Sequence, residues 1–426
     1  MIQFNIKPHD TARTSTTPSS NTTCSEKLNT HPWNQQSQPG YGPGASEADP
    51  LLHIPASQPL LPQQYRKASA QDLAERIAAA RRALGERVLI LGHYYQRDDI
   101  VAHADFIGDS FQLAQIIAQK PHAETIVFCG VHFMAETARI LAREHQSIVL
   151  PHLGAGCSMA DMASSPAVMA CWDYLHSVYH RSSQHTSQRP AVIPITYMNS
   201  SAALKAFCGD HGGIVCTSSN AQHVLEWALS QGQRVLFFPD QHLGRNTAHA
   251  LKIPPEQIVL WERHNRHGGL SEQQIVNAKV ILWNGFCSVH QRFSVAQVHA
   301  ARARFSEAIV LAHPECSQEV VQAADVVGST DVIARTVKQA APGQVFAIGT
   351  EINMVNRLAQ QYPQHTIFCL DPVVCPCSTM YRIHPAYLAW VLDGLMTNQI
   401  HNAINVPTAI AKNAYIALQR MLEVKP

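Results

Sequence analysis

The sequence predicts an α/β protein made of three homologous lobes with parallel strands, and a threefold internal repeat is the main reason. Short apolar runs alternate with helical segments, as they do in βαβ units. Each copy of the repeat ends in a cysteine followed directly by serine, at Cys157, Cys287 and Cys377. Ligands bind beyond the carboxyl ends of parallel strands, so three lobes around a pseudo-threefold axis would share one central site.

Each copy is expected to contain four strands in the same order. The first strand ends in His93, Tyr197 or His313 in the three copies. A helical stretch and a short second strand follow. The second strands end in the small hydroxylic residues Ser110, Ser218, Ser329 and Thr330. The first, middle and last strands are expected at 88–91, 125–129 and 148–150 in copy one, at 192–195, 234–238 and 280–283 in copy two, and at 309–311, 344–348 and 366–368 in copy three.

The spacing of these features supports a true repeat. From the first strand ending to the hydroxylic residue, copies one and three both span 17 residues, and from there to the cysteine both span 47. Copy two is longer, with intervals of 21 and 69 residues, and its extra residues are polar and rich in glycine. Such residues are typical of surface insertions.

The repeat also sets the expected domain boundaries. Residues 1–68 are rich in Ser, Pro and Gly and lack the apolar core of a signal peptide, so they predict a disordered tail. Order is expected from Ser69, which forms a capping box with Asp72. The three lobes are expected at 69–156, 157–286 and 287–377, with the C-terminal helices of 378–426 packing back on the first lobe.

Composition excludes several classes of protein. The net charge is +1, which favours neither nucleic acid nor a membrane surface as a partner. No apolar stretch reaches the ~18–20 residues that a membrane span needs. The 11 cysteines are an odd number and lie in or beside strands, which favours a reducing compartment such as the cytoplasm over a disulfide scaffold.

The three repeat cysteines are candidate metal ligands that leave one coordination position for substrate. The serine after each cysteine is expected to cap a helix, whose dipole would stabilise the thiolate. Cys316 also precedes serine, but it occupies another repeat position, and Cys375 is a close competitor of Cys377. Zinc and a [4Fe–4S] cluster both remain open on this basis, although three widely separated cysteines favour the cluster.

Over residues 70 to 426 the chain resembles the quinolinate synthase family. The motifs that carry the resemblance are, by first and last residue, Gly92 to Tyr95, Gly108 to Ser110, Phe133 to Ala138, Ala155 to Asp161, Tyr197 to Ala202, Thr217 to Asn220, Pro239 to Gly244, Gly285 to His290, His313 to Cys316, Gly328 to Thr330 and Cys377 to Met380. The resemblance implies three αβα sandwich lobes around a central [4Fe–4S] cluster with one open iron. It also implies the condensation of iminoaspartate with dihydroxyacetone phosphate to quinolinate in NAD biosynthesis. An L-aspartate oxidase or dehydrogenase is the implied source of iminoaspartate.

Candidate site residues follow from this chemistry. Carboxylates and phosphate require anion sites, and hydroxyls and backbone N–H groups at strand-to-helix turns can supply them. The expected substrate-binding residues are His93, Ser110, Tyr197, Asn199, Ser218, His313, Glu315, Ser329 and Thr330. The expected catalytic residues are Tyr95, Tyr197, His290, His313 and Glu315. By resemblance, Tyr95 assists phosphate departure, and Glu315 acts with His313 as acid and base.

Other roles stay open for the chain and for some residues. Glu136, Asp240 and Glu351 recur after the middle strands and are expected to form hydrogen bonds between lobes. A non-catalytic iron–sulfur sensor, a zinc-stabilised structural protein and an iron–sulfur dehydratase for another hydroxy acid are the alternative functions.

Overall fold

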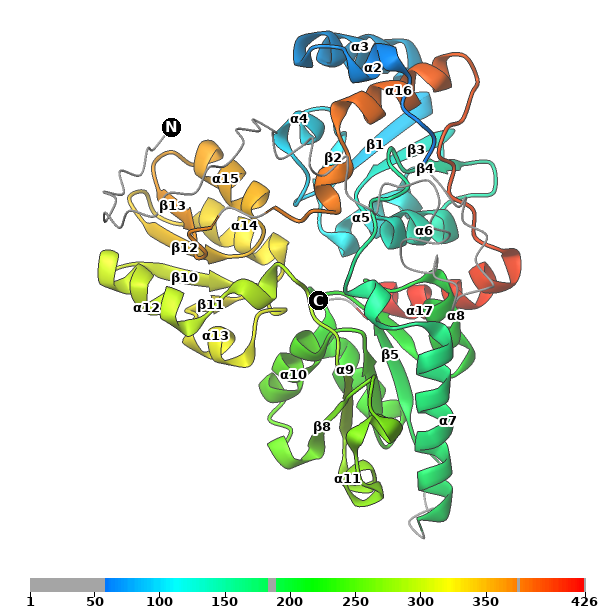
Figure 1. The fold of residues 1–426 in the computed structure, drawn as a ribbon, viewed down its shortest axis with the longest axis vertical. Coiled ribbons are helices and arrows are strands. Elements are labelled where there is room, and N and C mark those ends of the chain that lie inside the picture. Colours follow the sequence, from blue (N-terminus) through cyan, green and yellow to red (C-terminus); the bar gives the residue numbers. More distant parts are fainter. Residues whose placement is uncertain (1–57, 183–188, 374–375, 425–426) are drawn as a thin grey trace, which may run out of the picture.

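Three parallel β-sheets, each flanked by helices, surround the centre of the molecule (Figure 1). The computed structural model describes residues 58–182, 189–373 and 376–424. The strand orders are β2-β1-β3-β4, β6-β5-β7-β9-β8 and β11-β10-β12-β13, and every pairing within the sheets is parallel. The predicted fold class, α/β with three αβα lobes, is therefore confirmed. We call the sheets with their helices lobes one, two and three.

Lobe one contains the first copy of the repeat. Its elements are α3 (Ala70–Leu84), η2 (Gly85–Arg87), β1 (Val88–His93), α4 (Asp98–Val101), β2 (Phe106–Gly108), α5 (Ser110–Gln119), β3 (Thr125–Cys129), α6 (His132–Leu141) and β4 (Ser147–Val149). The capping box predicted at Ser69 and Asp72 is present and starts α3.

Lobe two follows Cys157 and is the largest. Its elements are η3 (Ala160–Met162), α7 (Ser165–Arg181), β5 (Ile193–Tyr197), α8 (Ala202–Asp210), β6 (Ile214–Cys216), α9 (Ala221–Gln231), β7 (Val235–Phe238), α10 (Gln241–Ala250), η4 (Pro255–Gln257), β8 (Ile258–Trp261), η5 (Arg266–Gly269), α11 (Glu272–Asn277) and β9 (Val280–Trp283). The extra length of copy two is more than surface loop, because β8 adds a partly buried fifth strand beside β9.

Lobe three follows Cys287 and repeats the order of lobe one. Its elements are η6 (His290–Arg292), α12 (Val295–Arg304), β10 (Ile309–Ala312), α13 (Gln318–Ala323), β11 (Val326–Val327), α14 (Thr330–Gln339), β12 (Val345–Gly349), α15 (Ile352–Gln361) and β13 (Thr366–Cys369). The chain then forms η7 (Met380–Arg382), α16 (Pro385–Met396) and α17 (Thr408–Glu423).

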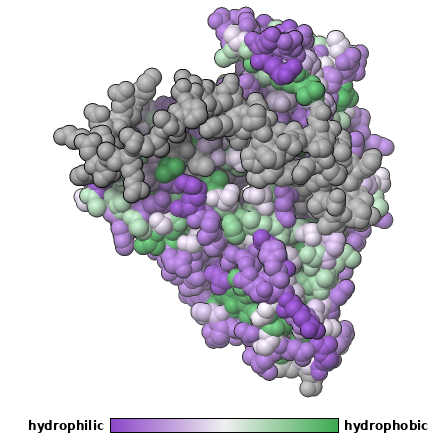
Figure 2. All heavy atoms as spheres, in the orientation of Figure 1, coloured by the Kyte–Doolittle hydropathy of each residue, from purple (hydrophilic) through white to green (hydrophobic). Residues whose placement is uncertain are grey.

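The cores lie on both faces of the sheets. Every residue of β1, β3, β5, β7, β9 and β12 is buried, as expected for parallel strands covered by helices on two sides. On the face drawn in Figure 2, hydrophilic side chains predominate where the surface is coloured, and apolar ones form separate small patches. None of the described helices has both the length and the apolar character needed to cross a membrane.

Each repeat cysteine starts a single tight turn. Backbone N–H groups of Asp161, Gln291 and Tyr381 donate to the cysteine carbonyls four residues earlier, at 2.9–3.1 Å. The expectation that the adjacent serines cap helices is wrong. The cysteine itself takes the capping position: its carbonyl accepts the backbone N–H four residues later, and its thiol accepts the backbone N–H three residues later. The longer helices α7, α12 and α16 begin later.

The two C-terminal helices pack back on the lobes, but only one of them packs mainly on lobe one, where both were expected. Helix α16 packs against α3 in lobe one, as predicted, whereas α17 packs mainly against α8 and β6 in lobe two. Ordered structure also begins before Ser69. A short helix, α2 (Gln63–Arg66), buries Tyr65, whose hydroxyl donates to Asp393 Oδ2 at 2.9 Å in α16. Residues 1–57 of the predicted tail lie outside the described residues.

Candidate active site

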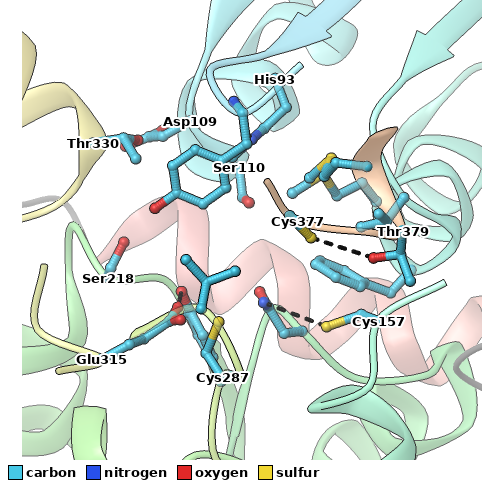
Figure 3. Close-up of a pocket in the computed structure, with 18 of the residues that line it drawn as sticks. His93, Asp109, Ser110, Cys157, Ser218, Cys287, Glu315, Thr330, Cys377 and Thr379 are labelled. Atoms are coloured by element: carbon cyan, nitrogen blue, oxygen red, sulfur yellow. Dashed lines mark hydrogen bonds between the residues drawn. The ribbon is translucent and has the colours of Figure 1, made fainter. Parts of the chain in front are cut away.

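A central cavity lies where the carboxyl ends of the strands of all three lobes meet. Its volume is about 70 Å³. Twelve of the predicted site residues line it: His93, Tyr95, Ser110, Cys157, Tyr197, Asn199, Ser218, Cys287, His313, Glu315, Thr330 and Cys377. Figure 3 shows the cysteines toward one side and the hydroxyl groups of Ser218 and Thr330 toward the other.

Two predicted residues lie behind the cavity wall. His290 is fully buried and reaches the cavity through its hydrogen bond to Glu315. Ser329 is the N-cap of α14, and its hydroxyl has no partner among the described residues. Asp109 and Thr379 line the cavity although the sequence argument passed over them, as do the apolar side chains of Val131, Phe133, Met134, Val289 and Met380.

The three cysteines point into one part of the cavity (Figure 3). Burial raises the pKa of all three thiols. The charge of Glu315 raises the pKa of Cys287 further, and neighbouring thiolates add to the pKa of both Cys157 and Cys287. The backbone N–H group three residues after each cysteine hydrogen-bonds its thiol and lowers the thiol pKa. The N-terminal N–H groups of each turn thus favour the thiolate, as expected, but burial has the larger effect on the thiol pKa.

A second group of metal-binding atoms overlaps this one. The ligand atoms of Cys287, His290 and Glu315 all lie within 4.8 Å of one another, so they could hold a metal ion. Both ring nitrogens of His290 and both oxygens of Glu315 already take part in hydrogen bonds with other side chains or with each other. A metal bound by this group would therefore have to replace those hydrogen bonds.

A chain of hydrogen bonds crosses the cavity wall and joins all three lobes. The Tyr197 hydroxyl donates to Glu315 Oε1 at 2.5 Å, and His290 Nδ1 lies 2.8 Å from Glu315 Oε2. His290 Nε2 lies 3.2 Å from the hydroxyl of Thr350, which in turn lies 2.7 Å from the hydroxyl of Tyr95. Protons can therefore be held or moved along one continuous path.

The surroundings fix the charge of these groups. Burial alone would raise the pKa of Glu315, but His290, His313 and the hydrogen bonds from His290 and Tyr197 outweigh burial and hold that pKa at about 2. Burial and the Glu315 charge raise the pKa of Tyr95 and Tyr197 well above the usual value. At neutral pH this chain of hydrogen bonds thus combines the Glu315 carboxylate with two protonated phenols.

His93 and His313 repeat the same local geometry. In each, Nδ1 accepts the backbone N–H of the residue two positions later, Tyr95 at 3.1 Å and Glu315 at 3.3 Å. Burial lowers the pKa of both imidazoles to about 3, so both are neutral at pH 7. Because Nδ1 accepts, the proton is on Nε2, and both rings offer an N–H donor.

Two helix N-termini reach the cavity. Ser110 is the first residue of α5, and Thr330 is the first residue of α14, so each places a hydroxyl at the first turn of a helix, where an anion can bind. Asp109 caps α5 and accepts the Ser219 hydroxyl of lobe two at 2.6 Å. This contact joins the N-terminus of α5 in lobe one to the strand end of lobe two that carries Ser218.

The three acidic residues after the middle strands do not share one role. Glu136 Oε2 accepts the Ala202 backbone N–H at 3.0 Å across the boundary of lobes one and two, as expected. Asp240 caps its own helix α10, and Glu351 caps α15 and accepts the Cys377 backbone N–H at 3.1 Å. The hydrogen bonds that we find for Asp240 and Glu351 thus lie within their own lobes.

Comparison with known proteins gives one consistent family. Residues 75–423 match the family model described as Quinolinate synthetase A protein. A quinolinate synthase from Corynebacterium glutamicum is 57% identical over 387 residues, covering 91% of this chain and 96% of that protein. Quinolinate synthases from Herpetosiphon aurantiacus and Bacillus subtilis are 49% and 44% identical, covering 85% and 87% of this chain and 95% and 98% of those proteins.

Proposed function

Because the chain belongs to the quinolinate synthase family, we propose that it condenses iminoaspartate with dihydroxyacetone phosphate to give quinolinate, phosphate and water in de novo NAD biosynthesis. One observation carries the proposal. A single cavity combines anion-binding helix N-termini, a buried carboxylate in a proton path, and three cysteines from three repeat copies. These features suit two substrates that together bring two carboxylates and a phosphate.

We assign Cys157, Cys287 and Cys377 as the ligands of a [4Fe–4S] cluster. Three thiols from three lobes fit an object with several metal corners better than a single ion, and their mutual electrostatic effect supports their proximity. When bound, such a cluster supplies one iron without a protein ligand as a Lewis acid for a carboxylate or hydroxyl. Binding would also stabilise the thiolate forms that burial disfavours.

The remaining residues have distinct tasks in this proposal. The Nε2–H groups of His93 and His313 bind substrate oxyanions, and the N-termini at Ser110 and Thr330 bind the phosphate, together with Ser218. Asn199 donates from its side-chain amide, and Ser329 caps the helix that carries Thr330.

Proton transfer is assigned to the hydrogen-bond chain. Glu315 is ionised and accepts a proton from substrate, and the Tyr197 hydroxyl and His290 stabilise the charge that moves. Tyr95 keeps its proton at neutral pH and can donate it to the departing phosphate oxygen. The apolar residues Phe133 and Met380 limit the access of water to these groups.

The cell biology of the protein is part of the same proposal. We assign it to the cytoplasm, where thiols stay reduced, and none of the nine cysteines in the described ranges forms a disulfide. Iminoaspartate hydrolyses readily, so an enzyme that oxidises L-aspartate is the expected source of the substrate.

The decisive experiment uses protein purified without oxygen. Oxaloacetate, ammonia and dihydroxyacetone phosphate are supplied, and quinolinate is measured by mass spectrometry alongside iron content. We expect product from the wild type and from Cys171→Ala, whose thiol is buried in α7, and no product from Cys287→Ala. Absence of product from protein that contains four irons would refute the reaction and favour a dehydratase or sensor. Zinc in place of iron would refute the cluster.

A further inference from the structure

In each lobe, one cavity residue has both of its flanking backbone carbonyls held by a single donor side chain. We propose that Arg357, Lys205 and Asn246 are positioning residues that aim Tyr95, Asn199 and Glu315, respectively, into the cavity. The inference rests on the proposed function for its kinetic test, but its geometry does not depend on the reaction.

Arg357 brackets Tyr95 from the neighbouring lobe. It lies on α15 of lobe three, and its Nη1 donates to the Tyr94 carbonyl at 2.9 Å while Nη2 donates to the Gln96 carbonyl. Nε donates to Asp98 Oδ1 at 2.7 Å, which fixes the guanidinium. One side chain of lobe three thereby holds the backbone on both sides of the catalytic tyrosine of lobe one.

Asn246 brackets Glu315 in the same way. It lies on α10 of lobe two, and its Nδ2 donates to the carbonyls of Pro314 and Cys316 in lobe three, both at 2.9 Å. The side chain is buried, and its Oδ1 has no hydrogen-bond partner among the described residues. The amide group is thus held by these two carbonyls alone.

Lys205 brackets Asn199 within lobe two. Its buried ammonium donates to the Met198 carbonyl at 2.9 Å and to the Ser200 carbonyl. It also lies 5.6 Å from the centre of the Phe133 ring of lobe one. A lysine with no exposed surface and no cavity contact requires a reason, because burying an ammonium is costly unless its donors are satisfied.

The shared geometry explains how such a contact aims a side chain. All three bracketed residues lie in tight turns, closed by backbone hydrogen bonds from Gln96 to His93 at 3.0 Å, from Ser200 to Met198 at 2.8 Å and from Cys316 to His313 at 2.9 Å. In each turn one donor holds the carbonyls on both sides of the residue. Fixing the two peptide planes around a residue fixes the direction of its Cα–Cβ bond. Tyr95, Asn199 and Glu315 occupy the same place after the first strand of each repeat, and all three line the cavity.

The chemistry of the three donors differs, although their contacts agree. A guanidinium, an ammonium and a carboxamide all bridge the carbonyls at positions −1 and +1, and two of the three come from the adjacent lobe. If these contacts served only to pack the lobes together, there would be no reason for the donor to bind the carbonyls on both sides of a cavity residue in every copy of the repeat. The common feature is therefore the orientation of the bracketed residue.

Kinetics on the iron-loaded enzyme test the proposal in lobe one. We expect Arg357→Met to lower kcat by about 10-fold or more, with iron content and melting temperature near wild type. Arg357→Lys is expected to recover most of the activity, because Lys205 already bridges two carbonyls in lobe two. In a Tyr95→Phe background, Arg357→Met should cost little further, whereas Lys205→Met should keep its full cost. Equal further losses in both cases would overturn the proposal.

A second readout is independent of catalysis. In a crystal structure of Arg357→Met, the Tyr95 hydroxyl should no longer lie within hydrogen-bond distance of Thr350, and in Asn246→Leu the Glu315 carboxylate should leave Tyr197. Unmoved side chains would refute the proposal, whatever reaction the protein catalyses. If Arg357→Met does not fold, Asn246→Leu carries the same test in lobe three. An inactive wild type with displaced side chains in the variants would instead refute only the proposed function.

Discussion

Glu315 is the residue on which the chemistry of the cavity depends most directly, because its carboxylate meets both Tyr197 and His290. Replacing it by glutamine removes the proton acceptor and places an amide N–H₂ against a hydrogen-bond donor. We therefore expect Glu315→Gln to lower kcat by ~100-fold or more. Turnover and iron should be measured on the same anaerobic sample. Full activity, or loss of iron, would contradict the assigned role.

Thr350 links Tyr95 to His290, and its isosteric replacement tests whether that link matters. The hydroxyl is buried and lies 2.7 Å from the Tyr95 hydroxyl. Thr350→Val keeps the volume and removes the hydrogen bonds, so we expect kcat to fall about 10-fold. Thr336→Val is the matched control, since its hydroxyl bonds only within α14. Equal effects of the two variants would argue against a specific role for Thr350.

At the same scale, sequence reasoning found the residues that sit at strand ends and missed those that act from elsewhere. His93, Tyr197 and His313 follow apolar strands directly, so their position could be inferred from pattern alone. Arg357 and Asn246 lie in the middle of helices of a neighbouring lobe. Their contacts depend on how lobes pack, and a single sequence carries no local signal for that.

At the scale of elements, the strands were predictable and the turns after the cysteines were not. Apolar runs of three to five residues identify buried parallel strands, and nearly every predicted run is a strand in the structure. The serine after each cysteine suggested a cap from residue type alone. The cysteine itself takes the capping position, which residue type does not reveal.

The contact between α8 and α17 offers a sharp test of packing between elements. Gly209 lies at the end of α8, where an added Cβ would meet the Asn413 carbonyl oxygen of α17 at 1.9 Å. Because backbone must move to admit even a methyl group, we expect Gly209→Ala to destabilise the protein by ~3 kcal/mol. Urea unfolding measures this. The neighbouring exposed Asp210→Ala should cost little, and similar losses in both variants would contradict the packing argument.

At the scale of the whole molecule, the two C-terminal helices add contacts to those that the lobes make with one another directly. Helix α16 packs on lobe one, which the symmetry of the repeat predicted, since α7 and α12 likewise follow a repeat cysteine into the next lobe. Helix α17 has no counterpart in the other copies, and it packs on lobe two. An element outside the repeat cannot be placed by the repeat, so this contact required the structure.

The pH dependence of stability follows from the number of buried neutral imidazoles in the assembled molecule. Burial lowers the pKa of His93, His152 and His313 to about 3 and that of His132 to about 4. Each folded-state pKa lies below the unfolded value near 6.5, so the unfolded chain binds protons first as the pH falls. Stability is therefore expected to be full above pH 6.5 and to decline toward pH 4.

His152 isolates one share of that decline, because it lies outside the cavity, where its ring packs against Tyr387 of α16 at 4.5 Å. Its Nδ1 accepts the Gly154 backbone N–H at 3.0 Å, and an asparagine oxygen can take over that bond without titrating. By pH 5 the wild type should lose about 2 kcal/mol more than His152→Asn relative to neutral pH. Urea unfolding of both proteins at pH 7.5 and pH 5 measures the difference. Equal losses of stability in the two proteins would mean that His152 is already protonated in the folded protein at pH 5. The junction of lobe one with α16 would then not be a site at which acid destabilises the protein.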